Sequence, residues 1–468
     1  MSSPRATHVP SHAAPPRMAQ RRLGRGARAL VALAALAAIV TLGACGGATR
    51  AVHTGTPTPM PNTGTLYFAT SPLGAAPDST TIHALSAGDG KQRWQHPVAG
   101  SPMPLVYNGT MLFLGTGQVS TGGPPSGSTL TAVTAATGAT AWQHDFTTQF
   151  VRPIAATAAT LFVTMTTRAT SGGMPATSLA ALHASDGTVI WSADVAGEPL
   201  GFVNFDGTAL YVITYPPNGG TATAPPPFTL TALGASDGKP LWQFTPAGPP
   251  LTGAYGPALS GGVLYLTEQS PTPPGPGAQP SSIIEAIAVH DGTRLWQTTT
   301  PAGTAVMDLL ASADGVFYTY SDYASPGGGL VALHASDGTT AWQQPLNDAG
   351  PSPALLAVDG TTVYAQVASL SAGAVVNLVF RAYDAHTGKV AYERALPSLP
   401  LQLLPKSSSP ALIVGGALYQ ALAGVQLGTA AAQQVQCVVL GLRTSDGSAQ
   451  WTHTLDGGPV SQLIYAGP

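Results

Sequence analysis

Charged residues are scarce in this chain, and the shortage limits the partners that it can have. Asp, Glu, Lys and Arg together make up 8% of the 468 residues. Residues 46–468 contain all 21 acidic residues but only 12 of the 18 basic ones, so this part has a formal net charge of 12 minus 21, or −9. A sparse and mildly acidic surface does not attract phosphate groups, and we therefore expect no nucleic acid partner.

Cysteine is almost absent, since the chain contains only Cys45 and Cys437. We expect no structural disulfide, because Cys45 belongs to the N-terminal segment described below. Cys437 lies in the apolar run 435–440, where a buried and unreactive side chain is expected rather than a nucleophile. No Ser/His/Asp set, zinc-ligand spacing or phosphate-binding glycine loop stands out, and we predict that the chain is not an enzyme.

Long apolar runs are lacking as well. The run 29–42 is too short for a comfortable membrane span, follows several arginines and ends in Leu42-Gly43-Ala44-Cys45. This segment resembles a bacterial lipoprotein signal peptide, in which Cys45 becomes the lipidated first residue of the mature protein. We therefore expect a protein of the cell envelope, held by its lipid on the extracytoplasmic side of a bacterial membrane.

Two features of this N-terminal segment leave alternatives open. Translation starts at Met1 or at Met18, which gives a more usual signal length. Export follows the Sec route or, because of Arg21-Arg22, the twin-arginine route. The expected organisation is a signal peptide at 1–45, a disordered Thr/Pro-rich tether at 46–63 and an ordered domain at 64–468.

The ordered part is dominated by a repeat of about 50 residues. Each copy has an alternating apolar run, a turn that ends in Gly and an aromatic residue four positions after that Gly, as in residues 332–342. The Gly tolerates positive φ, and a small residue ten positions before the aromatic is expected to leave room for a Trp of the neighbouring repeat. We expect the aromatic residues to dock adjacent repeats onto each other. They are Trp94, Trp142, Trp191, Trp242, Trp296, Trp342, Tyr392 and Trp451.

Each repeat contains four strand-like segments, which in the second repeat cover 104–107, 111–115, 130–135 and 139–146. Four antiparallel strands repeated eight times predict an all-β fold, an eight-bladed β-propeller. The first repeat begins with its second strand at Thr65, and residues 458–465 resemble the first strand at 101–107. We therefore expect the C-terminal strand to complete the first blade and to hide both sheet edges.

The repeat resembles the tryptophan-docking motif of the pyrroloquinoline-quinone (PQQ) propeller superfamily, Ala-x-Asp-x-x-Thr-Gly-Lys-x-x-Trp. Residues 382–392 follow it apart from the final Tyr392. Within this superfamily, the predicted lipidation makes the chain similar to the BamB lipoproteins of outer-membrane β-barrel assembly, and it also resembles uncharacterised extracytoplasmic propellers. The superfamily's quinoprotein dehydrogenases hold their cofactor with an adjacent Cys-Cys disulfide and a calcium ion. This chain has no such Cys pair and its acidic residues fall mostly in turns, so we expect no PQQ, no other cofactor and no metal.

The connections after the second strand of each repeat are long and varied, whereas the turns after the first and third strands are short. Variable loops on a rigid scaffold commonly carry binding, although tolerated decoration is the alternative. We predict the loop face to be the partner face, with Tyr215, Phe228 and Tyr323 as aromatic anchors at the loop rims. The loops cover 71–80, 117–128, 168–177, 215–228, 269–282, 321–328, 368–377 and 424–434.

Together these patterns predict a monomeric, membrane-anchored, extracytoplasmic propeller that acts as a scaffold for envelope proteins. Binding or sensing of a small ligand such as a sugar is the alternative, and a quinoprotein-type enzyme is a third possibility. Convergent carboxylates near the ring axis would favour an enzyme, whereas a broad apolar loop face would favour a scaffold.

Overall fold

The computed structural model describes much of the repeat region but not the N-terminal segment. The described residues are 63–72, 79–117, 127–167, 176–195, 197–215, 228–246, 248, 257–270, 279, 281–322, 328–346, 354–371, 374–396, 401–403, 411–426, 435–459 and 461–467. All of them belong to the compact unit Pro57–Pro468, and Met1–Thr56 form a separate unit. A helix long and apolar enough to span a membrane is not found among the described residues.

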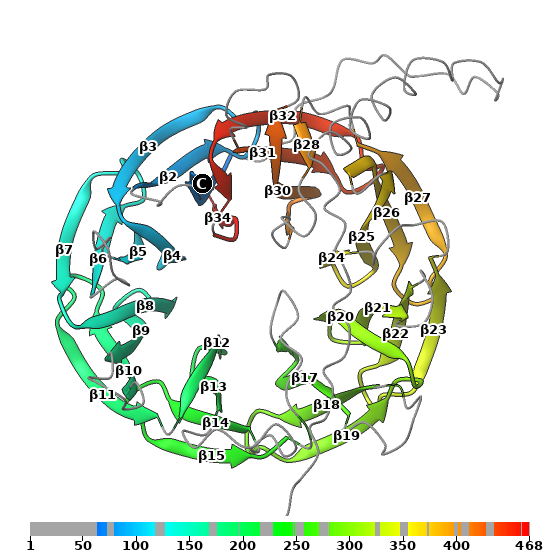
Figure 1. Cartoon of the computed structure of the whole chain (residues 1–468), viewed down its shortest axis with the longest axis horizontal. Coiled ribbons are helices and arrows are strands. Elements are labelled where there is room, and N and C mark those ends of the chain that lie inside the picture. The colour runs from blue at the N-terminus through cyan, green and yellow to red at the C-terminus, as the bar shows by residue number, and fades with distance from the viewer. Residues whose placement is uncertain are drawn as a thin grey trace, which may run out of the picture. The chain divides into compact units, whose positions relative to one another are not determined.

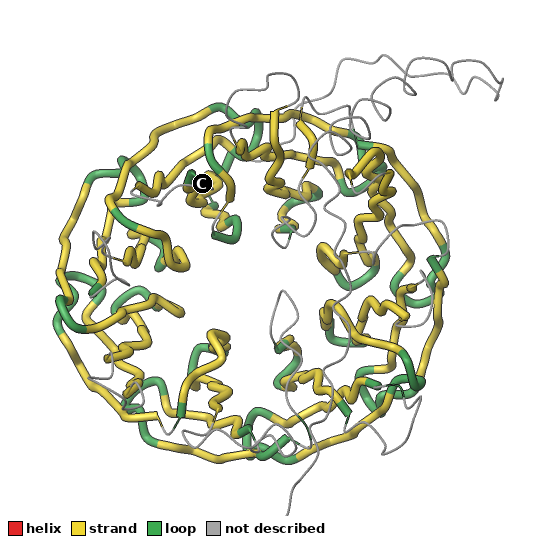
Figure 2. The backbone as a smooth tube through the Cα atoms, in the orientation of Figure 1, coloured by secondary structure: helices red, strands yellow, loops and turns green. Residues whose placement is uncertain are grey.

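Within the larger unit, the strands form eight antiparallel sheets arranged as a ring, and each sheet is one blade (Figure 1). Strands joined by turns and loops make up the described chain (Figure 2). The prediction of an all-β, eight-bladed propeller is therefore confirmed.

The first four blades follow the chain from the N-terminal side. Blade 1 contains β1 (Thr65–Ser71), β2 (Ser79–Ser86) and β3 (Gln92–Ala99); blade 2 contains β4 (Ser101–Tyr107), β5 (Met111–Gly117), β6 (Ser128–Thr134) and β7 (Thr140–Phe146); blade 3 contains β8 (Gln149–Ala156), β9 (Thr160–Thr167), β10 (Ala176–His183) and β11 (Val189–Val195); blade 4 contains β12 (Glu198–Phe205), β13 (Ala209–Tyr215), β14 (Thr229–Gly234) and β15 (Pro240–Phe244).

The other four blades continue around the ring in the same order. Blade 5 contains β16 (Ala258–Ser260), β17 (Val263–Gln269), β18 (Ser282–Ala288) and β19 (Arg294–Thr299); blade 6 contains β20 (Thr304–Ala311), β21 (Gly315–Asp322), β22 (Gly328–His334) and β23 (Thr340–Pro345); blade 7 contains β24 (Ala354–Val358), β25 (Thr362–Ser371), β26 (Ala374–Asp384) and β27 (Val390–Ala395); blade 8 contains β28 (Leu401–Leu403), β29 (Leu412–Val414), β30 (Ala417–Gln426), β31 (Val435–Arg443) and β32 (Ala449–Asp456).

The C-terminal chain closes the ring in blade 1, as the sequence predicts. Two short strands, β33 (Gly458–Pro459) and β34 (Ile464–Ala466), pair with β1. Thr70 lies opposite Pro459, and Thr65 lies opposite Ala466. The edge of β1 is thus covered by two strand segments rather than by the single strand expected at 458–465, which protects it from pairing with another chain.

The prediction of a long loop at 368–377 is wrong. In the structure β25 runs to Ser371 and β26 starts at Ala374, so the two strands form one extended hairpin in which Leu370 lies opposite Val375. The β-branched Val375 and Val376 favour strand structure, and the ladder continues until Ser371 lies opposite Ala374.

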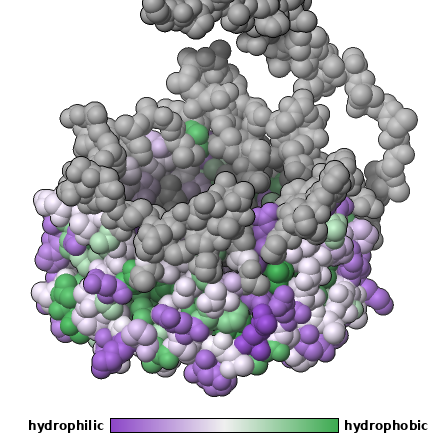
Figure 3. Space-filling view, turned by 60° about the horizontal axis from the view of Figure 1, so that its bottom comes forward, coloured by the Kyte–Doolittle hydropathy of each residue, from purple (hydrophilic) through white to green (hydrophobic). Residues whose placement is uncertain are grey.

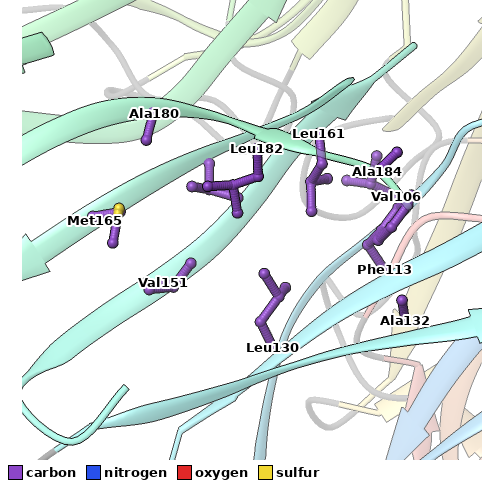
Figure 4. Packing of buried hydrophobic residues seen from close by; sticks show 11 residues of the cluster. Val106, Phe113, Leu130, Ala132, Val151, Leu161, Met165, Ala180, Leu182 and Ala184 are labelled. Atoms are coloured by element: carbon purple, nitrogen blue, oxygen red, sulfur yellow. The ribbon is translucent and has the colours of Figure 1, made fainter. Parts of the chain in front are cut away.

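The hydrophobic core lies between successive blades. The cluster between blades 2 and 3 shows the pattern, with Phe113 and Leu130 of blade 2 packed against Val151, Leu161 and Leu182 of blade 3 (Figure 4). These side chains are almost completely buried, and each contributes about 1.5–3 kcal/mol by its removal from water. A hydrophobic cluster of this kind lies at each boundary between successive blades.

Every blade has a β-bulge at the same place in its outermost strand. In blade 4, Ala232 lies opposite Trp242 and Leu233 lies opposite Pro240, so Leu241 is the extra residue of the bulge. The same register shift occurs in the other seven blades. The residue before each repeat aromatic is consequently outside the hydrogen-bonded ladder.

Candidate functional site

The repeat aromatics connect each blade to the next. In blade 4 the indole N–H of Trp242 donates a hydrogen bond of 2.8 Å to the carbonyl of Val289 in blade 5. The equivalent bond occurs at every blade boundary, with the Tyr392 hydroxyl in place of an indole. The other donor and acceptor pairs are Trp94 and Ala135, Trp142 and Ala184, Trp191 and Ala235, Trp296 and Ala335, Trp342 and Ala385, Tyr392 and Thr444, and Trp451 and Ala87.

The Gly of each repeat turn receives the aromatic ring of the preceding blade. Gly292 has φ +74°, and a Cβ at this position would lie 2.5 Å from the Trp242 ring. The glycine is therefore required for two reasons: it adopts a left-handed conformation, and it leaves space for the ring.

The expected role of the small residue ten positions before the aromatic is wrong. A Cβ at Gly441 would lie 2.6 Å from Trp451, which belongs to the same blade. Ala286 likewise lies directly opposite Trp296 across the β18–β19 ladder. The small residue makes room for the aromatic of its own blade, because directly opposed side chains in antiparallel strands are close together.

The acidic residues of the repeat turns are used within the turns. The Oδ1 atom of Asp337 accepts hydrogen bonds from the amide and the hydroxyl of Thr339, and these bonds lower the pKa of Asp337. The Lys91 ammonium lowers the pKa of Asp89 to about 2. These carboxylates stay ionised and fix turn geometry. Across the described segments, no group of three or more His, Cys, Asp or Glu residues could hold a metal ion.

The adjacent Cys pair of the quinoprotein dehydrogenases has no counterpart in this sequence. Cys437, one of only two cysteines in the sequence, has no accessible surface, and burial raises the pKa of its thiol to about 12. It packs in the core between blades 8 and 1 with Phe68 and Val439. The side chain is a small buried hydrophobe, as expected from the sequence.

One buried histidine was not singled out by the sequence. His83 is 4% exposed, stacks on Phe68 and has Nε2 at 2.9 Å from the Thr70 hydroxyl oxygen. Burial, with a smaller effect of His453, lowers its pKa from 6.5 to about 4. Its Nδ1 has no hydrogen-bond partner among the described residues. The ring is therefore neutral near pH 7. The only sequence signal for it was a His within the apolar run of the third strand of the repeat.

The sequence also did not single out three buried acidic residues. The contacts that they make in the structure stabilise the fold. Glu285 accepts a 2.8 Å hydrogen bond from the Arg294 guanidinium, although Glu285 is fully buried and Arg294 is half exposed. Glu268 accepts the Gly248 amide, and Asp308 accepts the Leu355 amide of the next blade. In these contacts the carboxylates bind backbone amides or one cation. The sequence did not single out these acids, because a polar residue in an alternating strand is expected to face solvent.

The predicted aromatic anchors on the loop face differ in how far they are buried. Tyr215 is half-buried and meets Phe228 edge-on, with ring centroids 4.8 Å apart and an interplanar angle of 85°. Phe228 is only 4% exposed and packs with Tyr211 and Leu230, so the expectation of Phe228 as an anchor at the loop rim is wrong: its ring belongs to the core. Tyr323 and most of the loop residues lie outside the described residues.

Comparison with known proteins gives one family match and several structural matches. The family model described as outer membrane protein assembly factor BamB matches residues 126–272 and 280–464. No match was found among curated proteins.

Among solved structures, the chain is similar to BamB from Moraxella catarrhalis, at 17% identity over 75% of this chain and 92% of that chain, with a TM-score of 0.43. It is also similar to the quinohemoprotein alcohol dehydrogenase ADHIIG from Pseudomonas putida HK5, at 12% identity over 77% and 71% of the two chains, with a TM-score of 0.44. The dihydro-heme d1 dehydrogenase NirN matches at 9% identity over 89% and 77%, with a TM-score of 0.50. At such identities the structural similarity concerns the fold alone.

Proposed function

The chain belongs to the family described as outer membrane protein assembly factor BamB, and from this premise we propose that it is a lipid-anchored scaffold that binds proteins of the cell envelope. It is proposed to catalyse no reaction. The ordered domain at 64–468 would be held at the membrane through Cys45 by the tether at 46–63, after removal of the signal peptide.

One structural observation supports a scaffold: the repeated side chains that could do chemistry are committed to the fold. Seven turn carboxylates accept backbone amides of their own turns, as in Asp186, Asp237 and Asp291. Tryptophans dock one blade onto the next at seven blade boundaries, and Tyr392 does so at the eighth. A ring built this way is a rigid support, and its specificity is left to the surfaces around it.

The experiment that tests the proposal compares the two faces of the propeller. Residues 216–227 and 271–279 are replaced by Gly-Ser linkers in one variant, and the turns Asp206-Gly207 and Asp359-Gly360 are altered in a matched variant. Envelope proteins captured by chemical cross-linking are then quantified for both. We expect the loop variant to lose its partners and the turn variant to keep them.

Two results would count against the proposal in different ways. Capture of no envelope protein by the wild-type chain contradicts the scaffold function itself. Loss of partners in the turn variant with retention in the loop variant contradicts the loop face as the binding surface.

A further inference from the structure

Four large aliphatic side chains are exposed on the outer wall of blades 3 to 5. Val189, Ile190, Leu241 and Leu295 are between 42% and 59% exposed. They lie on the outermost strands β11, β15 and β19. We call these four residues the outer sector.

The fold does not require aliphatic residues at these positions. Ile190, Leu241 and Leu295 are the bulge residues that precede the repeat aromatic, outside the ladder. The equivalent position is occupied in the other five blades by Arg93, Ala141, Ala341, Ala391 and Gln450. Charged, small and amide side chains all occur there, so the bulge itself does not require the large aliphatic side chains of blades 3 to 5. Outside these blades, one more large hydrophobic among the described residues is exposed, Val390 of blade 7 at 51%.

The bulge residues of the outer sector occupy the same structural position on three consecutive blades. Trp191 follows Ile190 and touches Gly238, three residues before Leu241. Trp242 follows Leu241 in the same way and touches Gly292, three residues before Leu295. In the view that brings the wall of blades 4 and 5 forward, apolar surface alternates with polar residues (Figure 3).

The charges around the outer sector are predominantly acidic. Asp186, Asp194 and Asp291 are exposed on blades 3 and 5, and Asp291 has the His290 ring at 3.2 Å. The two nearby cations are paired, Lys239 with Asp237 at 3.0 Å and Arg294 with Glu285 at 2.8 Å. The outer sector is therefore a set of aliphatic side chains interspersed with mainly acidic ones, which attracts basic groups and repels the phosphates of a lipid surface.

We propose that the outer sector docks a protein segment in which aliphatic residues alternate with Lys or Arg. This inference rests on the proposed function, because a scaffold that joins proteins needs a second surface besides the loop face. The bulges interrupt the outer strand edges at these positions and make them poor templates for strand addition. The segment is accordingly held by side-chain contacts rather than by a continued β-ladder.

A peptide binding assay tests the proposal. The probe is a fluorescent peptide of alternating Lys and Leu, and its anisotropy is measured with the full chain in zwitterionic nanodiscs, with empty nanodiscs as a blank. A peptide of alternating Glu and Leu and one of alternating Lys and Ser serve as comparisons. The Leu241→Lys/Leu295→Lys variant is expected to bind the Lys-Leu peptide at least about tenfold more weakly than the wild type, the usual scale for the loss of a buried aliphatic anchor.

The matched control carries the same charges at the same structural position elsewhere. Ala341→Lys/Ala391→Lys alters the bulge residues of blades 6 and 7 and is expected to bind like the wild type. Equal weakening by both variants, or equal binding of the Glu-Leu or the Lys-Ser peptide, would overturn the proposal. So would a chain that binds anionic vesicles or a second copy of itself through the outer sector instead of the peptide.

The same variants separate this proposal from the scaffold function. If the Leu241→Lys/Leu295→Lys chain captures every envelope protein that the wild type captures, the scaffold stands and the outer sector is not a docking surface. If neither chain captures any protein, the scaffold function itself has failed.

Discussion

At the scale of single residues, the repeat aromatics combine burial with one directed hydrogen bond. Trp342 is 9% exposed and donates to the Ala385 carbonyl at 2.8 Å. Tyr392 makes the equivalent contact with its hydroxyl, to Thr444 at 2.6 Å. The chain thus shows that two different aromatic side chains can do the same task.

This equivalence gives a matched pair of substitutions. Trp342→Ala is expected to cost about 3–5 kcal/mol, the range for deletion of a large buried aromatic. Trp342→Tyr is expected to cost clearly less, because a ring and a donor remain. The readout is the unfolding rate or the midpoint of a thermal scan, since large folds commonly unfold irreversibly. A wild-type midpoint for Trp342→Ala would show that the indole does not hold the blades together.

The buried His83 makes stability depend on pH. Its pKa is lowered from 6.5 to about 4 by burial and by His453, so the unfolded chain binds more protons than the folded chain between these values. The free energy of unfolding is therefore highest above about pH 6.5 and falls by up to about 3 kcal/mol as the pH drops to about 4.

Denaturant or scan midpoints measured from pH 7.5 to 4.5 test this expectation. His83→Leu is expected to flatten the profile, and His334→Gln, which changes an exposed ring, is the matched control. A wild-type profile that is already flat in this window would show that His83 is protonated without penalty.

At the scale of elements, the repeat turn is the most constrained part of a blade. Gly292 and Gly262 lie in blade 5 with nearly the same φ, +74° and +75°. A Cβ at Gly292 would meet the Trp242 ring at 2.5 Å, whereas one at Gly262 would meet only Val289 Cγ2, at 3.9 Å. Substitution of each glycine therefore distinguishes the cost of backbone strain, which both share, from the cost of a clash with the Trp242 ring, which only Gly292 has.

Both Gly→Ala changes are expected to cost about 1–2 kcal/mol for the left-handed backbone. Gly292→Ala is expected to cost a further 1–3 kcal/mol, roughly the range for overpacking, because the Trp242 ring must move. Scan midpoints of the two variants provide the measurement. Equal midpoints would mean that the ring adjusts freely and that the turn is not a docking surface.

The sequence predicted well those elements whose structure is determined by contacts between residues close in the chain. The alternation and the turn Gly in residues 332–342 are local signals, and the strands and turns they predicted are present in the structure. The split of the first strand of blade 8 into β28 and β29, and the continued pairing of β25 with β26, depend on partners distant in sequence. The same holds for Phe228 and His83, whose burial is decided by packing between blades.

At the scale of the whole molecule, the ring is closed by chain ends that pair in one blade. β1 receives β33 and β34 from the C-terminus, and the Arg93 guanidinium binds the carbonyl oxygens of Thr63 and Gly64 at the start of the described chain. The edge of β1 is therefore covered, and the chain just before it is fixed to blade 1 by a charged side chain.

The anchor can be tested with the two cysteines of the chain. Cys45→Ser is expected to release a folded protein from the membrane fraction, since two or more acyl chains account for stable anchoring. Cys437→Ala changes the other thiol, which is buried, and is expected to leave the protein in the membrane fraction. Recovery of the Cys45→Ser protein with membranes after a salt wash would contradict lipidation as the anchor.

The central claim, a scaffold for envelope proteins, is tested most directly by purification of the chain from its own cell envelope after mild cross-linking. The measurement is the molar amount of each co-purified protein relative to the chain. The account predicts at least one envelope protein in near-stoichiometric amount, lost when the loop face is replaced. Recovery of the chain alone, together with specific binding or conversion of a small molecule, would contradict it.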